Sequence, residues 1–253
     1  MTWRYVDGYA VGTSHLASNL PCQDRCEVGV LGDGRFVVAV LADGAGSAAH
    51  AERAAELACA SLMEAIANDV EGAHDLARVN DDVIRSWFAR IRAHIAGEAD
   101  VHDHDVRDYA TTVLACVAGE REAICVQLGD GGIVVRVAGD TFVPALWPEG
   151  GEYANQTFFV TDDDALDRLS IARFGRVDDV VLFSDGLSRL ALDHTNKSAF
   201  MPFFEPLTRT VRESGASRAQ LGADLDAYLA SDAINARTDD DKAICIATRV
   251  PPG

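Results

Sequence analysis

The sequence is poor in basic residues. Its 22 lysines and arginines stand against 40 aspartates and glutamates, which gives a formal net charge of −18 and a pI near 4.6. A surface with this charge repels polyanions at long range. Nucleic acid, which proteins bind largely through Lys and Arg contacts to phosphate, is therefore not an expected partner, and neither is an anionic membrane.

Long apolar runs and paired cysteines are also missing. No stretch of eighteen uninterrupted apolar residues occurs, so no membrane-spanning helix is expected. The first residues, MTWRYVDGYAVGTSH, do not join a basic segment to an apolar one, so no secretion signal is expected. The six cysteines form no CxxC pair, and four of them lie in apolar runs as small hydrophobic residues. These features predict a cytoplasmic protein with reduced cysteines.

Internal repeats, low-complexity tracts and linkers are absent as well, so residues 1–253 are expected to form a single, monomeric domain. Hydrophobic residues make up 48% of the chain and the mean hydropathy is +0.02, which is typical of a globular protein. A chain of this length buries roughly three quarters of its unfolded surface, so its core needs no structural metal. Any metal that it binds is expected to be functional.

Apolar, β-rich runs punctuated by Gly and Asp predict strands at residues 3–11, 26–31, 35–42, 110–118, 123–128, 132–137, 156–160, 179–184 and 243–249. Apolar residues at helical spacing predict helices over 48–67, 81–97, 200–213 and 217–231. Helices thus occur in pairs between groups of strands. This order favours an α+β fold with mainly antiparallel sheets over a doubly wound parallel sheet.

Aspartates stand where several of these predicted strands stop or begin. A single Asp-Gly after a strand is usually only a tight turn. Several carboxylates brought together need a cation, because like charges in close contact cannot all stay ionised. A ligand set made only of oxygen favours Mg²⁺ or Mn²⁺ over zinc. The aspartates in question are Asp24, Asp43, Asp130, Asp185 and the run Asp239-Asp240-Asp241.

Seven segments distributed over nearly the whole chain carry a family resemblance. They are GTSHLASNLPCQD (12–24), LADGAGS (41–47), TTVLACVA (111–118), QLGDGGIVV (127–135), GEYANQTFFVTDDDA (151–165), LFSDGLSRLAL (182–192) and RTDDDKAICIA (237–247). In this order they resemble the metal-dependent protein phosphatases of type 2C (the PPM family), most closely its stand-alone bacterial, PphC-like members. The resemblance implies two stacked, mainly antiparallel sheets flanked by paired helices, a four-layer α-β-β-α sandwich, with a binuclear metal centre at one edge.

The resemblance also implies a role for individual residues. Asp43 would bridge two Mn²⁺ or Mg²⁺ ions. The Gly44 carbonyl and Asp24 would complete the protein ligands of one ion, and Asp185 and Asp240 those of the other. A hydroxide shared by the two ions would then attack phosphorus in line, with no phosphoenzyme.

Two of these assignments leave alternatives open. Asp130 would hold a third, weaker ion together with Asp185, or it would be only a turn residue. The last ligand is ambiguous by one position, because three aspartates are consecutive. We prefer Asp240 over Asp239 and expect Asp241 to be a supporting residue.

The chain departs from the family pattern at three positions. Ala45 stands where many members carry His, and Ala243 stands where they often carry Ser or Thr. His15 stands where many bacterial members carry an Arg that binds the substrate phosphate, so His15 would take that role or would be merely a strand-end residue. In the irregular segment 144–176, the resemblance implies a substrate-contacting flap that includes Tyr153 and Asn155.

The predicted activity is that of an Mg²⁺/Mn²⁺-dependent protein serine/threonine phosphatase. Its expected partners are phosphorylated proteins, with a cognate serine/threonine kinase or its targets among them. A catalytically inactive, phosphatase-like module that binds a kinase or phosphoprotein is the first alternative, and a phosphatase for small phosphoesters is the second. Retention of Asp43, Asp185 and Asp240 argues against the inactive module.

Overall fold

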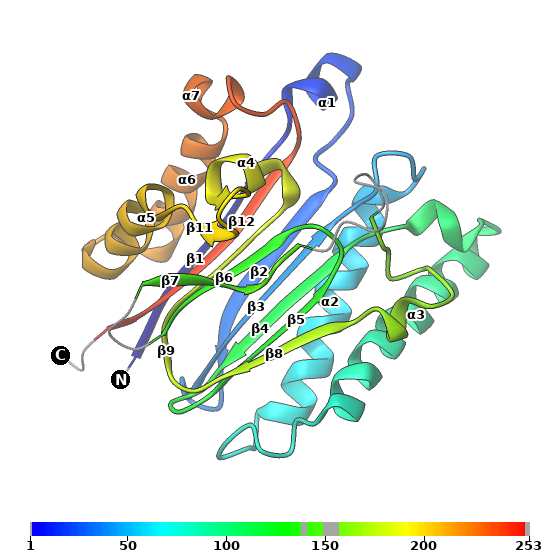
Figure 1. Ribbon diagram of the computed structural model, residues 1–253. Coiled ribbons are helices and arrows are strands. Elements are labelled where there is room, and N and C mark those ends of the chain that lie inside the picture. The colour runs from blue at the N-terminus through cyan, green and yellow to red at the C-terminus, as the bar shows by residue number, and fades with distance from the viewer. Residues whose placement is uncertain (1, 138–140, 149–156, 251–253) are drawn as a thin grey trace.

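The computed structural model describes residues 2–137, 141–148 and 157–250. Two five-stranded antiparallel sheets stack face to face in it (Figure 1). The strand order is β1-β12-β9-β6-β7 in the first sheet and β2-β3-β4-β5-β8 in the second. The predicted α+β fold with two stacked antiparallel sheets is therefore confirmed.

The first sheet consists of β1 (Thr2–Ala10), β12 (Lys242–Val250), β9 (Val177–Phe183), β6 (Gly132–Val137) and β7 (Phe142–Leu146). The second consists of β2 (Asp24–Leu31), β3 (Phe36–Asp43), β4 (Val113–Ala118), β5 (Ala123–Leu128) and β8 (Ser170–Phe174). A separate short pair is formed by β10 (Leu192–Asp193) and β11 (Ser198–Ala199).

Paired long helices cover the outer faces of the sandwich (Figure 1). Over the second sheet lie α2 (Ala51–Val70) and α3 (Asp81–His102), and over the first lie α5 (Met201–Glu213) and α6 (Arg218–Leu229). The short helices α1 (Thr13–Ser18), α4 (Ser188–Ala191) and α7 (Asp232–Asn235) lie toward the upper end in Figure 1. Three 3-10 turns are η1 (Val106–Tyr109), η2 (Ala165–Asp167) and η3 (Asp185–Leu187). None of the helices in the described ranges has the length and apolar run needed to cross a bilayer.

Three apolar layers hold the four structural layers together, as strand β3 illustrates. Alternate side chains of a strand point to opposite faces of its sheet. Val38, Val40 and Ala42 pack against α2 and α3, whereas Val37, Ala39 and Leu41 pack against the first sheet. Because β3 is buried on both faces, its sequence is an unbroken apolar run that ends at Asp43.

The structure corrects the expected elements at several places. Residues 157–160 form no strand, although a strand was predicted over 156–160. The sequence prediction missed β7 and β8, each of which is one of the two edge strands of its sheet. Edge strands tolerate proline and polar residues, so Pro144 in β7 and the SIARF sequence of β8 gave no clear signal. It also missed α1, which has no buried residue and therefore no apolar periodicity to detect.

Candidate active site

Five predicted carboxylates meet in one cavity of about 240 Å³ at the end of the sandwich. Asp24 and Asp43 face each other as partners in the β2–β3 pairing. The other three come from different elements: Asp130 from the turn between β5 and β6, Asp185 from the start of η3 just after β9, and Asp240 from the residues just before β12. The cavity is also lined by Gly44, His15, Gln23, Thr112, Thr157 and Asp241, among others.

The backbone at Asp43 and Gly44 is held in place by residues that precede β4. Thr112 N–H and the Thr111 hydroxyl donate to the Asp43 carbonyl at 2.8 and 2.9 Å, and Asp43 N–H donates to the Thr112 hydroxyl at 3.2 Å. A Cβ atom on Gly44 would lie 2.4 Å from the carbonyl oxygen of Ala51. Only glycine therefore fits where the chain turns from β3 toward α2.

Asp130 lies in the turn between β5 and β6 and lines the same cavity. The buried Gln127 amide donates to the carbonyls of Gly129 and Gly131, each at 3.1 Å, and so braces the turn. The Thr157 hydroxyl donates to Asp130 Oδ2 at 2.6 Å. Sequence reasoning missed Thr157, since only the fold brings the segment after residue 156 beside the β5–β6 turn.

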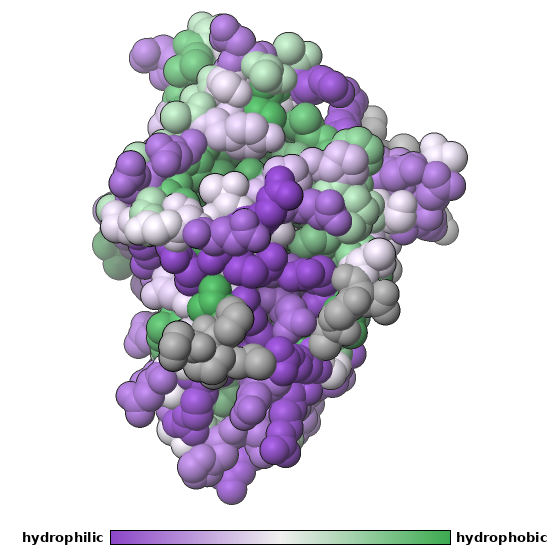
Figure 2. Space-filling model, turned by 90° about the vertical axis from the view of Figure 1, so that its left-hand side faces the viewer, coloured by the Kyte–Doolittle hydropathy of each residue, from purple (hydrophilic) through white to green (hydrophobic). Residues whose placement is uncertain are grey.

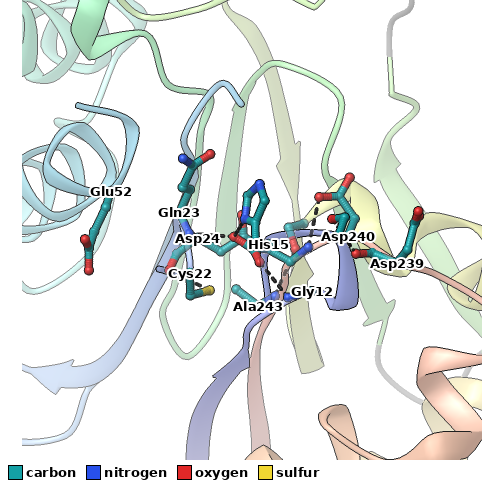
Figure 3. Close-up of polar contacts among 12 residues, drawn as sticks. Gly12, His15, Cys22, Gln23, Asp24, Glu52, Asp239, Asp240 and Ala243 are labelled. Atoms are coloured by element: carbon teal, nitrogen blue, oxygen red, sulfur yellow. Dashed lines mark hydrogen bonds and ion pairs between the residues drawn. The ribbon is translucent and has the colours of Figure 1, made fainter. Parts of the chain in front are cut away.

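Asp241 organises another part of the cavity lining. Its carboxylate is 3% exposed and accepts the N–H of Gly12 on Oδ1 and the N–H of Gln23 on Oδ2, both at 2.6 Å. The His15 Nδ1–H donates to Oδ2 at 2.9 Å, which leaves Nε2 as the ring nitrogen without this bond. In the view of Figure 3 the His15 ring lies between Gln23 and Asp240. His15 lies in helix α1 and not at the end of a strand, and its bond to Asp241 is compatible with a structural role.

Burial and mutual repulsion raise the pKa of the innermost carboxyls. Asp24 is 1% exposed, and burial together with the charges of Asp241 and Asp185 raises its pKa to about 8, although a hydrogen bond with Ser184 acts in the opposite direction. Burial and then the charges of Asp24 and Asp185 raise the pKa of Asp43 well above its usual range. Without a cation, this cluster is therefore protonated more readily than ordinary carboxyls.

The two outer carboxyls follow the same trend. Burial, followed by the charges of Asp130 and Asp240, raises the pKa of Asp185 to about 6. Burial also raises the pKa of Asp240. Asp240 Oδ1 accepts the N–H of Asp241 at 2.9 Å, which orients its carboxylate at the start of β12.

The donor set fits a hard divalent cation. Asp24 Oδ2 and the Gln23 side-chain oxygen are buried and have no hydrogen-bond partner within the described residues. An unpaired buried carboxylate oxygen is costly, and a cation removes that cost. In the described part of the chain, no three His, Cys, Asp or Glu side chains already converge as a ready-made ligand group. Carbonyl oxygens and water would therefore complete the coordination, as is typical of Mg²⁺ and Mn²⁺.

Two residues of the predicted flap, Tyr153 and Asn155, lie outside the residues that the structure describes.

Of the three consecutive aspartates, Asp240 and Asp241 line the cavity and Asp239 does not. Asp239 contributes through its backbone instead, since its carbonyl accepts the N–H and hydroxyl of Ser14 at 3.0 and 2.7 Å.

Metal-free protein should lose stability as the pH rises. The pKa values of Asp24 and Asp185, about 8 and about 6, lie above the value of about 3.9 for an aspartate in an unfolded chain. Between these values the folded state binds more protons than the unfolded chain, so this contribution to stability is complete below about pH 4 and is lost as the pH passes through about 6 and 8. In chelator, Tm should fall by several degrees between pH 5.5 and about pH 8.5, and Mg²⁺ should restore it mainly at the higher pH.

The matched control for this measurement is Asp24→Asn, which removes one of the two titrations while keeping the size of the side chain. We expect a smaller decrease in Tm for this variant over the same pH range. A decrease that is equal in the native protein and in Asp24→Asn would show that the carboxylate cluster does not cause it.

Comparisons with known proteins point to one family. The sequence profile described as "Protein phosphatase 2C" matches residues 11–229. Serine/threonine-protein phosphatase 3 of Escherichia coli (strain K12) is 37% identical over 252 residues, which cover 98% of each chain. Among solved structures, phosphatase Stp1 from Staphylococcus aureus has a TM-score of 0.63 at 15% identity, covering 98% of this chain and 96% of that one. PppA of Pseudomonas aeruginosa has a TM-score of 0.64 at 18% identity, covering 98% of each.

Proposed function

Because the chain belongs to the protein phosphatase 2C family, it is a serine/threonine protein phosphatase, and we propose that the carboxylate cavity is its active centre. The observation that carries this proposal is that Asp24, Asp43, Asp130, Asp185 and Asp240 all line one cavity. The family depends on Mg²⁺ or Mn²⁺. We assign two such ions to this chain, with Asp43 shared between them.

In this assignment, Asp24 and the Gly44 carbonyl hold one ion and Asp185 and Asp240 hold the other, while Asp130 with Asp185 offers a weaker third position. When bound, the ions would polarise the phosphoryl oxygens and acidify a water molecule for attack on phosphorus. The chain's own contribution is to hold the carboxylates in place through the β2–β3 pairing and the Asp241 hydrogen bonds. Ala45 cannot transfer a proton, so a histidine at that position has no part in the reaction.

His15 is assigned to the substrate phosphate. Its ring lines the cavity, and the bond from Nδ1 to Asp241 fixes the orientation of the ring. The imidazolium form of a histidine would attract a phosphate dianion. The second nitrogen, Nε2, is then a donor available for a phosphate oxygen.

The His15 assignment predicts a pH-dependent KM. Histidine ordinarily loses its proton near pH 6.5, whereas arginine stays charged throughout the working range. In the native enzyme, KM should rise above neutral pH, and His15→Arg should flatten that rise while the metal requirement stays the same. The measurement is KM against pH for the native enzyme, His15→Ala and His15→Arg. Three identical profiles would return His15 to a purely structural role.

Phosphopeptide hydrolysis is the direct test of the proposed function. The native enzyme should release phosphate from phosphoserine and phosphothreonine peptides when Mn²⁺ is added and should stop when a chelator removes it. Hydrolysis of small aryl phosphates without any hydrolysis of phosphopeptides would favour the small-molecule phosphoesterase. Binding of a phosphopeptide without hydrolysis would favour the inactive binding module.

The remaining assignments concern the protein as a whole. We assign residues 1–253 to one phosphatase domain that acts as a monomer in the cytoplasm. Its substrates would be phosphorylated proteins, and a cognate serine/threonine kinase or the targets of that kinase fit this role. The acidic surface, with a net charge of −18, supports the absence of nucleic acid from the expected partners.

A further inference from the structure

A second cavity lies between α4, α5, α6 and the chain that follows α7. It has a volume of about 380 Å³, and its lining includes Phe200, Phe203, Tyr228, Arg189 and Arg237. We call it the α4–α6 pocket. Figure 2 shows the face that carries these helices: hydrophobic atoms are more frequent on its upper half, and the lower half is largely hydrophilic.

The α4–α6 pocket combines an apolar floor with exposed aromatic rings. Phe203 is 7% exposed and belongs to the core under the first sheet, whereas Phe200 and Tyr228 are 48% and 38% exposed. Phe200 and Tyr228 are thus large apolar side chains left in contact with water beside one cavity. Aromatic residues that are accessible in a concave site are typical of surfaces that bind protein segments.

The charge of the α4–α6 pocket is opposite to that of the protein as a whole. Neither Arg189 nor Arg237 has a hydrogen-bond or ion-pair partner for its guanidinium among the residues that the structure describes. The acidic residue in the lining, Asp193, hydrogen-bonds with residues of its own turn. It accepts from the N–H groups of Thr195 and Asn196 and from the Asn196 side-chain amide. The two guanidiniums are therefore available to an anionic group.

The position of both arginines links this pocket to the active centre. Arg189 lies four residues after Asp185, and Arg237 lies three residues before Asp240. A fully extended chain covers at most about 3.6 Å per residue, so each arginine is within about 14 Å of a proposed metal ligand. About four residues of an extended substrate could bridge the distance between the two sites.

We infer that the α4–α6 pocket binds a segment of the phosphoprotein substrate in which an apolar side chain stands next to an aspartate or glutamate, within about five residues of the phosphorylated residue. The apolar side chain would pack between Phe200 and Tyr228, and the carboxylate would pair with Arg189 and Arg237. This inference rests on the proposed phosphatase function and adds a substrate preference to it. The acidic residue is required because the free charges of the pocket are positive.

The test compares phosphothreonine peptides. One set carries Asp-Leu three to five residues before or after the phosphothreonine, a second carries Ala-Ala, and a third carries Lys-Leu at the same places. Native enzyme should hydrolyse the best Asp-Leu peptide with kcat/KM about fivefold above that of its Ala-Ala counterpart. Arg189→Glu/Arg237→Glu should lose this preference and favour Lys-Leu, with kcat/KM for a small aryl phosphate unchanged.

Arg90→Glu/Arg121→Glu is the matched control, since it makes the same charge change at two exposed arginines outside the pocket. It should keep the native preference. The inference is overturned if native enzyme hydrolyses Asp-Leu and Ala-Ala peptides with equal kcat/KM. It is also overturned if both double variants lose the Asp-Leu preference equally, or if Arg189→Glu/Arg237→Glu lowers kcat/KM for the aryl phosphate as much as for the peptides.

Failure of the proposed function would be seen separately, as an enzyme that hydrolyses neither aryl phosphate nor any peptide. Fluorescence anisotropy of a labelled Asp-Leu peptide then measures the α4–α6 pocket alone. Weaker binding in Arg189→Glu/Arg237→Glu than in the control variant would support the pocket. Equal binding in both variants would overturn it.

Discussion

Asp43→Asn should lower kcat by orders of magnitude and should not be rescued by more Mn²⁺. Asp43 faces Asp24 across the β2–β3 pair, and burial and neighbouring charges raise its pKa well above the usual range. That shift reflects the free energy that a cation recovers on binding. An amide has one acceptor oxygen and no charge, so it cannot serve two cations as a carboxylate can. The measurement is kcat for an aryl phosphate and for a phosphopeptide across a Mn²⁺ titration.

Asp239→Asn provides the matched control, because it makes the same chemical change at an aspartate that does not line the cavity. This control should keep nearly native kcat. The fold of both variants can be compared through Tm, which separates loss of chemistry from loss of structure. Full activity of Asp43→Asn, or of the native enzyme in chelator, would contradict the two-ion assignment.

Asp241→Ala should destabilise the protein on the order of 3 kcal/mol and also reduce kcat/KM. The carboxylate accepts the N–H groups of Gly12 and Gln23 and the Nδ1–H of His15. Its removal leaves two buried N–H donors unpaired and frees the segment that leads to Asp24. Urea denaturation measures the stability, and the KM of an aryl phosphate measures the effect on His15.

Asp239→Ala is the control for this variant as well, since the Asp239 side chain is exposed and it is the backbone carbonyl of Asp239 that accepts from Ser14. Asp239→Ala should lower the free energy of unfolding by less than about 0.5 kcal/mol. Asp241→Asn keeps one acceptor oxygen, so its free energy of unfolding should lie between those of Asp241→Ala and Asp239→Ala. If Asp241→Ala were as stable as Asp239→Ala, the proposed organising role of Asp241 would be wrong.

The interior strands of both sheets could be predicted from the sequence, and so could the edge strands β1 and β2, whereas the edge strands β7 and β8 could not. Strands β3, β4 and β5 are buried on both faces, so the sequence of each is a mainly apolar run with clear ends. The edge strands β7 and β8 are only partly buried and carry polar residues or proline. Helix α1 buries no side chain, and polar contacts with Asp239 and Asp241 hold it in place. Long-range contacts of this kind leave no local pattern in a sequence.

The same distinction applies to the site. The sequence by itself determined that aspartates stand at the ends of apolar runs, because they directly follow or precede those runs along the chain. It also determined the α+β class through the order of its helices and strands. Only the tertiary structure decided that Asp130 shares a cavity with Asp43, that Asp241 supports the segment before Asp24, and that Thr157 belongs to the site. These relations join residues tens to hundreds of positions apart, and only the packing of the two sheets and their connections brings them together.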